Sequence, residues 1–240
     1  MKTGKNKPLV GLLRMRNESL ILADTLKHMN EFCDFIYVYD DASNDASIEI
    51  YKNYKYVTDY IRNEFWHYHQ SRIQGMQRKN LFDYAKFKHP KANFIYMDAD
   101  ERIDIDWKKW DGESAIVMSL FDARMTENDF EPFKFGKKLK GFRKYFDKLI
   151  REIPFVFNNN ANYIGVACER YPQISNQKVQ KIGYVEHYGK SLSTKHWQET
   201  CEYYSKNLPE YAKKWEARKQ ETGIAESKNC ITWQQCKKIK

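Results

Sequence analysis

Residues 93–101 read Asn-Phe-Ile-Tyr-Met-Asp-Ala-Asp-Glu, so an apolar run passes into carboxylates without a turn residue between them. A short apolar run of this kind is typical of a strand buried on both faces, as in the centre of a parallel sheet. The carboxylates then stand at the carboxyl end of the strand, where open α/β sheets bind their ligands. The stretch therefore predicts both a sheet architecture and the place of a site.

Asp98 and Asp100 are separated by one residue, Ala99. Because strand side chains alternate between faces, both carboxylates are expected to point to the same side. Two such carboxylates repel each other unless a cation lies close to them. Mg²⁺ or Mn²⁺ is the expected cation, since both accept hard oxygen ligands. A strand end with two solvated acids is the alternative for an Asp-x-Asp pair taken alone.

The preceding residues alternate between two hydrophobic periodicities. Apolar runs predict further strands over residues 9–13, 35–39 and 56–61. Helical spacing predicts helices over residues 20–32, 48–54 and 75–87. Strands that alternate with helices indicate an α/β fold.

The loops after the first two strands are polar. Arg14 and Arg16 stand beside a helix N-terminus, where they can hold phosphate or lie on the surface as ordinary arginines. Asn17 or Ser19 is expected to cap that helix. Residues 40–47 read Asp-Asp-Ala-Ser-Asn-Asp-Ala-Ser, a turn whose serine or aspartate side chains can cap the second helix. Asp41 can alternatively accept hydrogen bonds from a base or ribose.

Composition limits the classes of partner and compartment. The chain has 240 residues, a net charge of +9 and 15% aromatic residues, which favours anionic partners and supplies flat surfaces for planar or sugar ligands. No apolar stretch has the length of a membrane span, and the first residues lack the apolar segment of a signal peptide. The five cysteines contain no Cys-x-x-Cys pair. We expect a cytoplasmic protein.

Four motifs occur in a fixed order along the first hundred residues. They are Arg-Asn-Glu at 16–18, the polar turn at 40–47, Arg-Lys-Asn at 78–80 and Asp-Ala-Asp-Glu at 98–101. In this order, residues 9–101 resemble the family 2 glycosyltransferases with the GT-A fold, particularly their short lipopolysaccharide-core-type members. The resemblance implies a Rossmann-like, mixed and mainly parallel sheet flanked by helices, with C-terminal helices. It also implies a nucleotide-sugar donor, Mn²⁺ or Mg²⁺, and inversion at the anomeric carbon.

The resemblance also assigns roles to individual positions. Residues assigned to nucleotide-sugar binding are Leu13, Arg14, Met15, Glu18, Asp41, Arg78, Asp98 and Ala99. Residues assigned to the metal are Asp98, Asp100 and His187, the last at the end of a predicted strand over residues 182–189. Glu169 would be the general base that takes the proton of the acceptor hydroxyl. The alternative for Glu169 is a plain salt bridge to Arg170 or to another neighbour. The alternative for His187 is a histidine that is satisfied at a strand end.

The domain organisation follows from the same comparison. Residues 1–190 are expected to form the catalytic domain, with a nucleotide-binding half (1–101) and an acceptor half (102–190). Within the second half, residues 128–140 are expected to form a mobile loop over the acceptor side. Residues 191–240 are expected to add helices and a partly ordered basic tail. Its lysines can touch an acidic membrane face, as a peripheral contact, or simply keep a charged helix solvated.

Three hypotheses for the function follow. The first is a metal-dependent inverting glycosyltransferase that moves a hexosyl or deoxyhexosyl group from a nucleotide-sugar, with UDP favoured, to a glycan or glycolipid acceptor. The second is a nucleotidyl or phosphoryl transferase, against which the lack of a Gly-rich phosphate loop counts. The third is a basic nucleic-acid-binding module, which is disfavoured because acids lie at the ligand edge of the predicted sheet. The first hypothesis predicts no nucleic-acid partner, and the sequence leaves the oligomeric state open.

Overall fold

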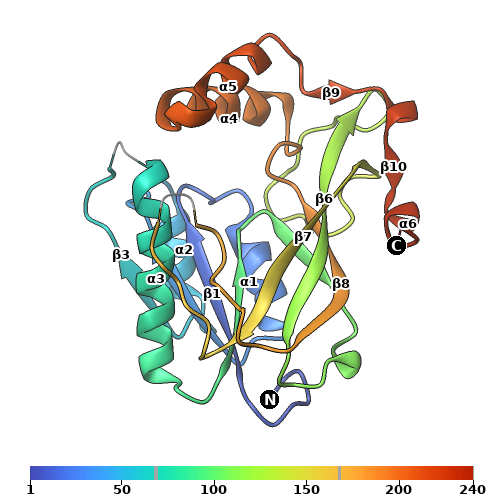
Figure 1. The fold of residues 1–240 in the computed structure, drawn as a ribbon. Helices are drawn as coiled ribbons and strands as arrows, with labels where there is room; N and C mark the ends of the chain where they lie inside the picture. Colours follow the sequence, from blue (N-terminus) through green and yellow to red (C-terminus); the bar gives the residue numbers. More distant parts are fainter. Residues whose placement is uncertain (68–69, 167–168, 240) are drawn as a thin grey trace.

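The computed structural model describes residues 1–67, 70–166 and 169–239, in which one sheet runs through the whole chain (Figure 1). The strand order is β3-β2-β1-β4-β7-β6-β8-β5. The first four of these strands are parallel: β3 (Asp59–Arg62), β2 (Phe35–Asp40), β1 (Leu9–Met15) and β4 (Asn93–Met97). The predicted α/β class, a Rossmann-like sheet flanked by helices, is confirmed.

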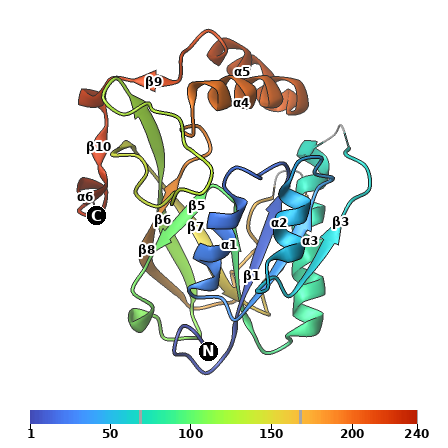
Figure 2. The ribbon, with the colours of Figure 1, turned by 180° about the vertical axis from the view of Figure 1, so that it is seen from behind.

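Both faces of the parallel strands are covered, which explains their nearly continuous apolar sequences. One face packs against α1 (Leu22–Asn30) and α2 (Ser47–Asn53), and the other packs against α3 (Gln70–Lys88) (Figures 1 and 2). Along β1, Leu9 and Leu13 belong to the first core and Val10 and Leu12 to the second. All three predicted helices are present, although α3 begins before Gly75.

The second half of the sheet is largely antiparallel and extends the first half without a break. Its long strands β6 (Ala115–Thr126) and β7 (Tyr145–Asn158) pair with each other, and β7 also pairs with β4. The strand β8 (Val179–His187) lies parallel to β6 and antiparallel to β5 (Glu101–Asp104). Because β5 follows the acidic turn after β4, this arrangement carries the end of β8 toward that turn.

The segment 128–140, predicted to be a mobile loop, contains no helix or strand, and two of its side chains are buried; its mobility stays a prediction. Phe133 and Leu139 are buried in the main core. The buried Arg143 donates to the carbonyl oxygens of Glu131 and Ser191. Although the segment is rich in charged residues, its two buried apolar side chains pack into the core and hold it against the body of the protein.

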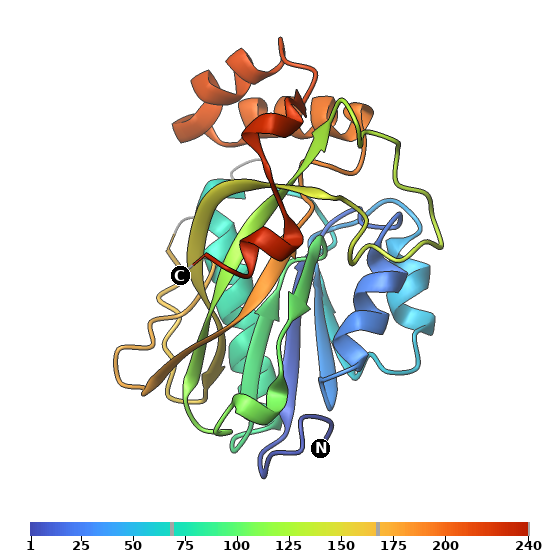
Figure 3. The same cartoon turned by 90° about the vertical axis from the view of Figure 1, so that its right-hand side faces the viewer.

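The last fifty residues close over the sheet and return along it. Helices α4 (Thr194–Asn207), capped by Ser193, and α5 (Ala212–Arg218) lie across the carboxyl ends of the parallel strands (Figure 3). Two short strands follow, β9 (Ile224–Ala225) beside β6 and β10 (Ile231–Thr232) beside β7, and then α6 (Trp233–Cys236). The remaining elements are the 3-10 helices Trp107–Lys109, Pro209–Tyr211 and Ser227–Asn229.

The prediction of a partly ordered tail is therefore wrong. Trp233, which looked isolated in the sequence, packs against Phe121 and Phe146. Lys237, one of the lysines considered for a membrane contact, instead forms an ion pair with Asp104 at 2.5 Å, whereas Lys240 lies outside the described residues. Among the described helices, none combines the length and the apolar character needed to cross a membrane.

Candidate functional site

A pocket of about 500 Å³ lies at the carboxyl ends of β1 and β4, beneath α4 and α5. Eight of the residues predicted for the site line it: Arg14, Met15, Glu18, Arg78, Asp98, Ala99, Asp100 and His187. Three predicted residues are not among those that line it: Leu13, Asp41 and Glu169. The sequence therefore located the pocket, but not every side chain that faces it.

The two aspartates that defined the site stand on a tight turn rather than on the strand. The strand β4 ends at Met97, and the backbone N–H of Glu101 then donates to the carbonyl of Asp98 at 3.2 Å. The Glu101 carboxylate in turn accepts from the Asp98 N–H at 2.9 Å. Because strand alternation stops before Asp98, the expected common orientation does not carry over: both carboxylates line the pocket but have different partners.

Asp98 is held by two guanidinium groups. Its Oδ2 lies 3.0 Å from Nη1 of Arg170, and its Oδ1 lies 3.9 Å from Nη2 of Arg78 and accepts from the Tyr96 hydroxyl at 2.9 Å. Burial raises the pKa of Asp98, but Arg170 and Arg78 outweigh it and the pKa is lowered overall. Arg170 also pairs with the buried Glu101. The carboxylate of Asp98 is therefore held in ion pairs and is not a solvated acid at a strand end.

Asp100 faces the second half of the chain. Its Oδ2 lies 3.4 Å from Nε2 of His187, whose Nδ1 contacts the carboxylate of Asp122. Arg151 pairs with the same oxygen of Asp122. Burial acts to lower the pKa of His187, but the carboxylates of Asp100 and Asp122 raise it to about 10. Burial acts to raise the pKa of Asp100, but the neighbouring His187 lowers it to about 2. In the absence of another cation, His187 is therefore an imidazolium between the carboxylates of Asp100 and Asp122.

Asp100 and His187 are suited to a divalent cation. The Oδ1 atom of Asp100 is buried and has no hydrogen-bond partner among the described residues. A Cβ atom on Gly189 would collide with Oδ2 of the same carboxylate, so glycine keeps the space beside the pair open. Within the described ranges, no three His, Cys, Asp or Glu side chains are grouped as metal ligands. A cation that takes one or two protein ligands and completes its shell with substrate phosphates matches this donor set.

Asp41 lies behind the pocket wall, beneath Arg14. Its buried carboxylate accepts from Nη2 of Arg14 at 2.7 Å, from Gln77 at 2.7 Å and from Asn63 at 2.9 Å. In this arrangement Asp41 orients Arg14 toward the pocket. Direct recognition of a base by Asp41 stays a prediction, as does a role for Leu13, which is buried in the core.

The loop between β1 and α1 is held by side chains from the loop after β2. The N–H groups of Asn17, Glu18 and Ser19 donate to side-chain oxygens of Ser43, Ser47 and Asp45 respectively. Neither Asn17 nor Ser19 caps α1, whose N-cap Ile21 makes no side-chain cap bond. The prediction of those caps is wrong, because these polar residues connect the two loops and do not cap the helix.

This loop presents two groups of opposite character to the pocket. Glu18 is half-buried among acidic neighbours, and loss of solvation, with Asp100, Asp98 and Asp45, raises its pKa well above the usual value. The guanidinium of Arg16 lies 4.6 Å from the ring of Trp66. The loop therefore offers a carboxyl with a raised pKa and a cation at the same edge of the sheet.

Glu169 does not face the pocket in this structure. Its carboxylate accepts from the backbone N–H groups of Ile164 and Gly165 at 3.1 and 2.6 Å, and its carbonyl accepts from Arg78 at 3.1 Å. The alternative of a salt bridge with Arg170 is also not found, because Arg170 pairs with Asp98 and Glu101. Glu169 therefore shapes its own loop, and its role as general base stays a prediction.

The roof of the pocket was not foreseen. Tyr203, Tyr204 and Trp215 from α4 and α5 line it, and the rings of Tyr204 and Trp215 stack at 4.7 Å. His196 also lines the roof, and its Nδ1 is buried without a hydrogen-bond partner in the described part of the chain. The high aromatic content pointed to such a surface but not to its place.

Asp122 is a further residue that the sequence analysis did not select. A lone acid within the apolar strand β6 is an available signal, because buried carboxylates need partners. Here its partners are His187 and Arg151.

Comparisons with known proteins leave the family open. No model of a protein family matches the sequence, and no curated protein matches it. Among solved structures, that of 4-diphosphocytidyl-2C-methyl-D-erythritol synthase aligns over 65% of this chain and 77% of its own, with 9% identity and a TM-score of 0.40. HddC from Yersinia pseudotuberculosis aligns over 81% of this chain and 98% of its own, with 11% identity and a TM-score of 0.37. Similarities this weak decide nothing about this chain, so its function is argued from its own pocket.

Proposed function

We propose that the protein is a metal-dependent inverting glycosyltransferase with a GT-A-type active site, related to family 2. It would transfer a sugar from a nucleotide-sugar, with UDP as the favoured nucleotide, to a hydroxyl group of a glycan or glycolipid. The observation that carries the proposal is the turn at Asp98–Asp100. This turn sets one carboxylate between arginines and the other against His187, inside a single pocket roofed by aromatic rings.

The charges of the pocket suit a diphosphate leaving group. Its lining residues include Arg14, Arg16, Arg78 and Arg170. Asp100 and His187 would hold Mg²⁺ or Mn²⁺, which when bound neutralises negative charge on a departing diphosphate. Arg16 and Arg78 would stabilise the same charge from the protein side.

The aromatic roof suits the sugars. Flat rings such as those of Tyr203, Tyr204 and Trp215 offer apolar surface with polar edges, which matches the mixed character of a sugar ring. Glu169 is retained as the proposed base, on the condition that its two backbone hydrogen bonds break when an acceptor binds. A carboxylate must come within hydrogen-bond reach of the hydroxyl whose proton it takes.

The first experiment is a calorimetric titration with UDP, GDP, CMP and dTDP, each with Mn²⁺ and with EDTA. Metal-dependent binding of one nucleotide is expected, and its sugar derivatives then become the candidate donors. Asp100→Ala should abolish transfer while the melting temperature stays close to that of the parent. Asp83→Asn, an exposed carboxylate on α3 outside the pocket, is the control and should leave transfer intact. Metal-dependent transfer by Asp100→Ala would refute the assignment.

A nucleotidyltransferase is the second candidate, favoured by the excess of cations over carboxylates in the pocket. Such an enzyme transfers the nucleoside monophosphate group of a nucleoside triphosphate to the phosphate of an acceptor and releases pyrophosphate. Pyrophosphate release from a nucleoside triphosphate and a sugar phosphate, without hydrolysis or transfer from nucleotide-sugars, would establish this reaction instead.

A further inference from the structure

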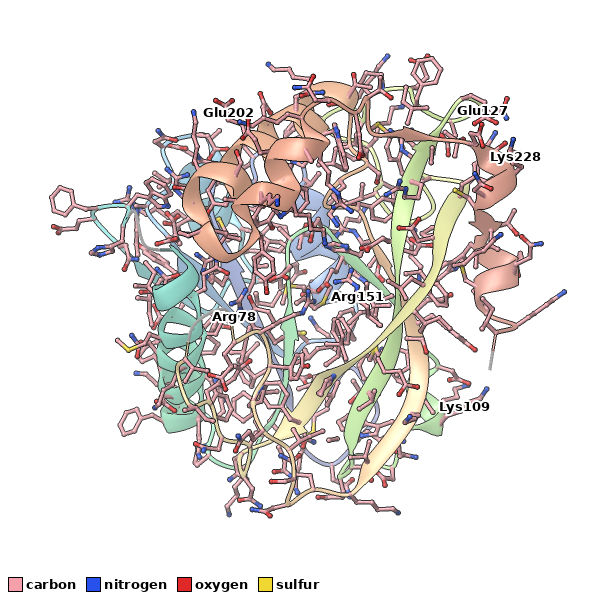
Figure 4. All side chains as sticks on the ribbon, turned by 45° about the horizontal axis from the view of Figure 1, so that its top comes forward. Arg78, Lys109, Glu127, Arg151, Glu202 and Lys228 are labelled. Carbon is pink, nitrogen blue, oxygen red and sulfur yellow. The ribbon has the colours of Figure 1, made fainter. Side chains whose placement is uncertain are left out.

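The corner of the pocket beneath α5 is built by the second half of the chain. Arg151 from β7, Lys190 just after β8, and Trp215 from α5 all line it. In Figure 4, Arg151 lies on the side of β7 and Arg78 on the side of α3. Arg78 approaches Asp98, whereas Arg151 approaches His187 at 3.3 Å, so the two guanidiniums flank opposite ends of the acidic turn and its histidine.

Positive charge in this corner exceeds the negative charge available to balance it. Arg151 pairs with Asp122, but the same carboxylate oxygen also contacts His187. Among the residues that the structure describes, no carboxylate forms an ion pair with Lys190. Its ammonium lies 5.4 Å from the ring of Trp215, and the guanidinium of Arg218 lies 4.9 Å from the same ring.

The surroundings of Lys190 disfavour an ammonium that has no counter-ion. Burial lowers the pKa of Lys190; Asp122 opposes this effect, whereas Arg218 and Arg151 add to it. A cation held in such a place gains most from an anion that enters the pocket, because a charge-assisted hydrogen bond is stronger away from bulk water.

We propose that Lys190 and Arg151 form a subsite for an anionic group, a phosphate or a carboxylate, carried by the acceptor. This inference rests on the proposed function, since it takes the first-half side of the pocket as the place of the nucleotide. The acceptor is then an acidic glycan or a phosphorylated glycolipid rather than a neutral sugar.

The test distinguishes binding of the acceptor's anionic group from binding of the donor diphosphate. The parent protein, Lys190→Met and the control Lys181→Met are each titrated with UDP and Mn²⁺, and then with inorganic phosphate and with acetate on the UDP-loaded protein. Methionine keeps most of the length of the lysine side chain without its charge. Lys181 is an exposed residue of β8 that pairs with Glu152 outside the pocket. If UDP is not the nucleotide that binds, the one that binds replaces it, and if none binds, the anions are titrated into the free protein.

Phosphate or acetate should bind both the loaded parent and the control. The same anion should bind Lys190→Met roughly tenfold more weakly, because a hydrogen bond to a charged group is lost. The affinity for the nucleotide should stay within about twofold in all three proteins. A parallel loss of nucleotide affinity in Lys190→Met would overturn the inference, because it would assign the corner to the donor diphosphate. Anion binding that is absent from the parent or equal in all three proteins would also overturn it. Failure of every nucleotide to bind would count against the proposed function, whereas the comparison of anion affinities would still decide the subsite.

Discussion

Gly189 lies so close to the Asp100–His187 pair that an added methyl group would displace it. A Cβ atom there would collide with Oδ2 of Asp100 and lie 3.0 Å from Nε2 of His187. Gly189→Ala should therefore lower transfer by roughly 100-fold, the scale of loss for misplaced reacting groups. The steady-state rate and the melting temperature are measured together. An unchanged rate in a folded variant would show that the position of Asp100 is not critical.

His28 gives the fold a dependence on pH that is independent of the pocket. Burial, with Arg102 and Lys140, lowers its pKa from 6.5 to about 3, and its Nε2 accepts from the N–H of Ile103. Between these pH values the unfolded chain binds the proton and the folded protein does not, so stability falls as the pH is lowered. The slope is about 1.4 kcal/mol per pH unit.

The prediction is tested by urea unfolding of the parent and of His28→Gln between pH 7 and 5. The parent should lose stability over this range, and the variant should lose less, because glutamine can accept the same bond without titrating. Equal slopes would rule out His28 as the source.

At the scale of residues, sequence reasoning succeeded where a strand end fixes a position. Arg14 is the last but one residue of its strand, His187 ends its strand and Asp98 follows its strand, so predicting the strands placed these residues at one edge. It did not predict the direction of the Glu169 carboxylate, which depends on backbone contacts within its own loop. Lys190 was not selected because its partners come from distant parts of the chain.

At the scale of elements, α3 and the loop before Glu169 pack so closely that a glycine is required between them. A Cβ atom on Gly75 would collide with the carbonyl oxygen of Val166 and lie 3.1 Å from Cβ of Glu169. In a helix interior, Gly→Ala usually stabilises by about 0.5–1 kcal/mol. Gly75→Ala should instead lower the melting temperature, because the loop and its bond to Arg78 must move.

Asn80→Ala, at an exposed position of the same helix, is the matched control and should not destabilise the protein. Thermal unfolding of both variants decides the matter. A Gly75→Ala protein as stable as the parent would mean that the loop shifts without cost.

The elements of the first half were predictable because each apolar run has a single role in a doubly covered sheet. The last residues were not, since β10 and α6 have only a few residues each and depend on pairing with β7. Short segments of this kind carry too little periodicity to be recognised before their partner is known. Helices were expected after residue 190, but the sequence did not indicate that α4 and α5 would lie over the pocket.

At the scale of the molecule, the shared sheet should make the two predicted halves unfold together. The pairing of β4 with β7 joins them by backbone hydrogen bonds. Five of the six tryptophans lie after residue 101, two of them in residues 102–190 and three in residues 191–240. Fluorescence therefore reports mainly on the chain beyond the nucleotide-binding half, whereas far-ultraviolet circular dichroism reports on the whole chain. Urea transitions followed by the two signals should coincide. Separate midpoints would indicate that the nucleotide-binding half is an independent unit.

Because the roof of the pocket is formed by α4 and α5, it is synthesised much later than the acidic turn that it covers. A ribosome makes the strand ends with Asp98 and Asp100 long before it makes Tyr203, Tyr204 or Trp215. A nascent chain that has reached residue 190 thus carries every carboxylate of the acidic turn but none of the aromatic cover. Until the final helices emerge and fold back, the acidic turn lacks the cover that encloses it in the finished protein.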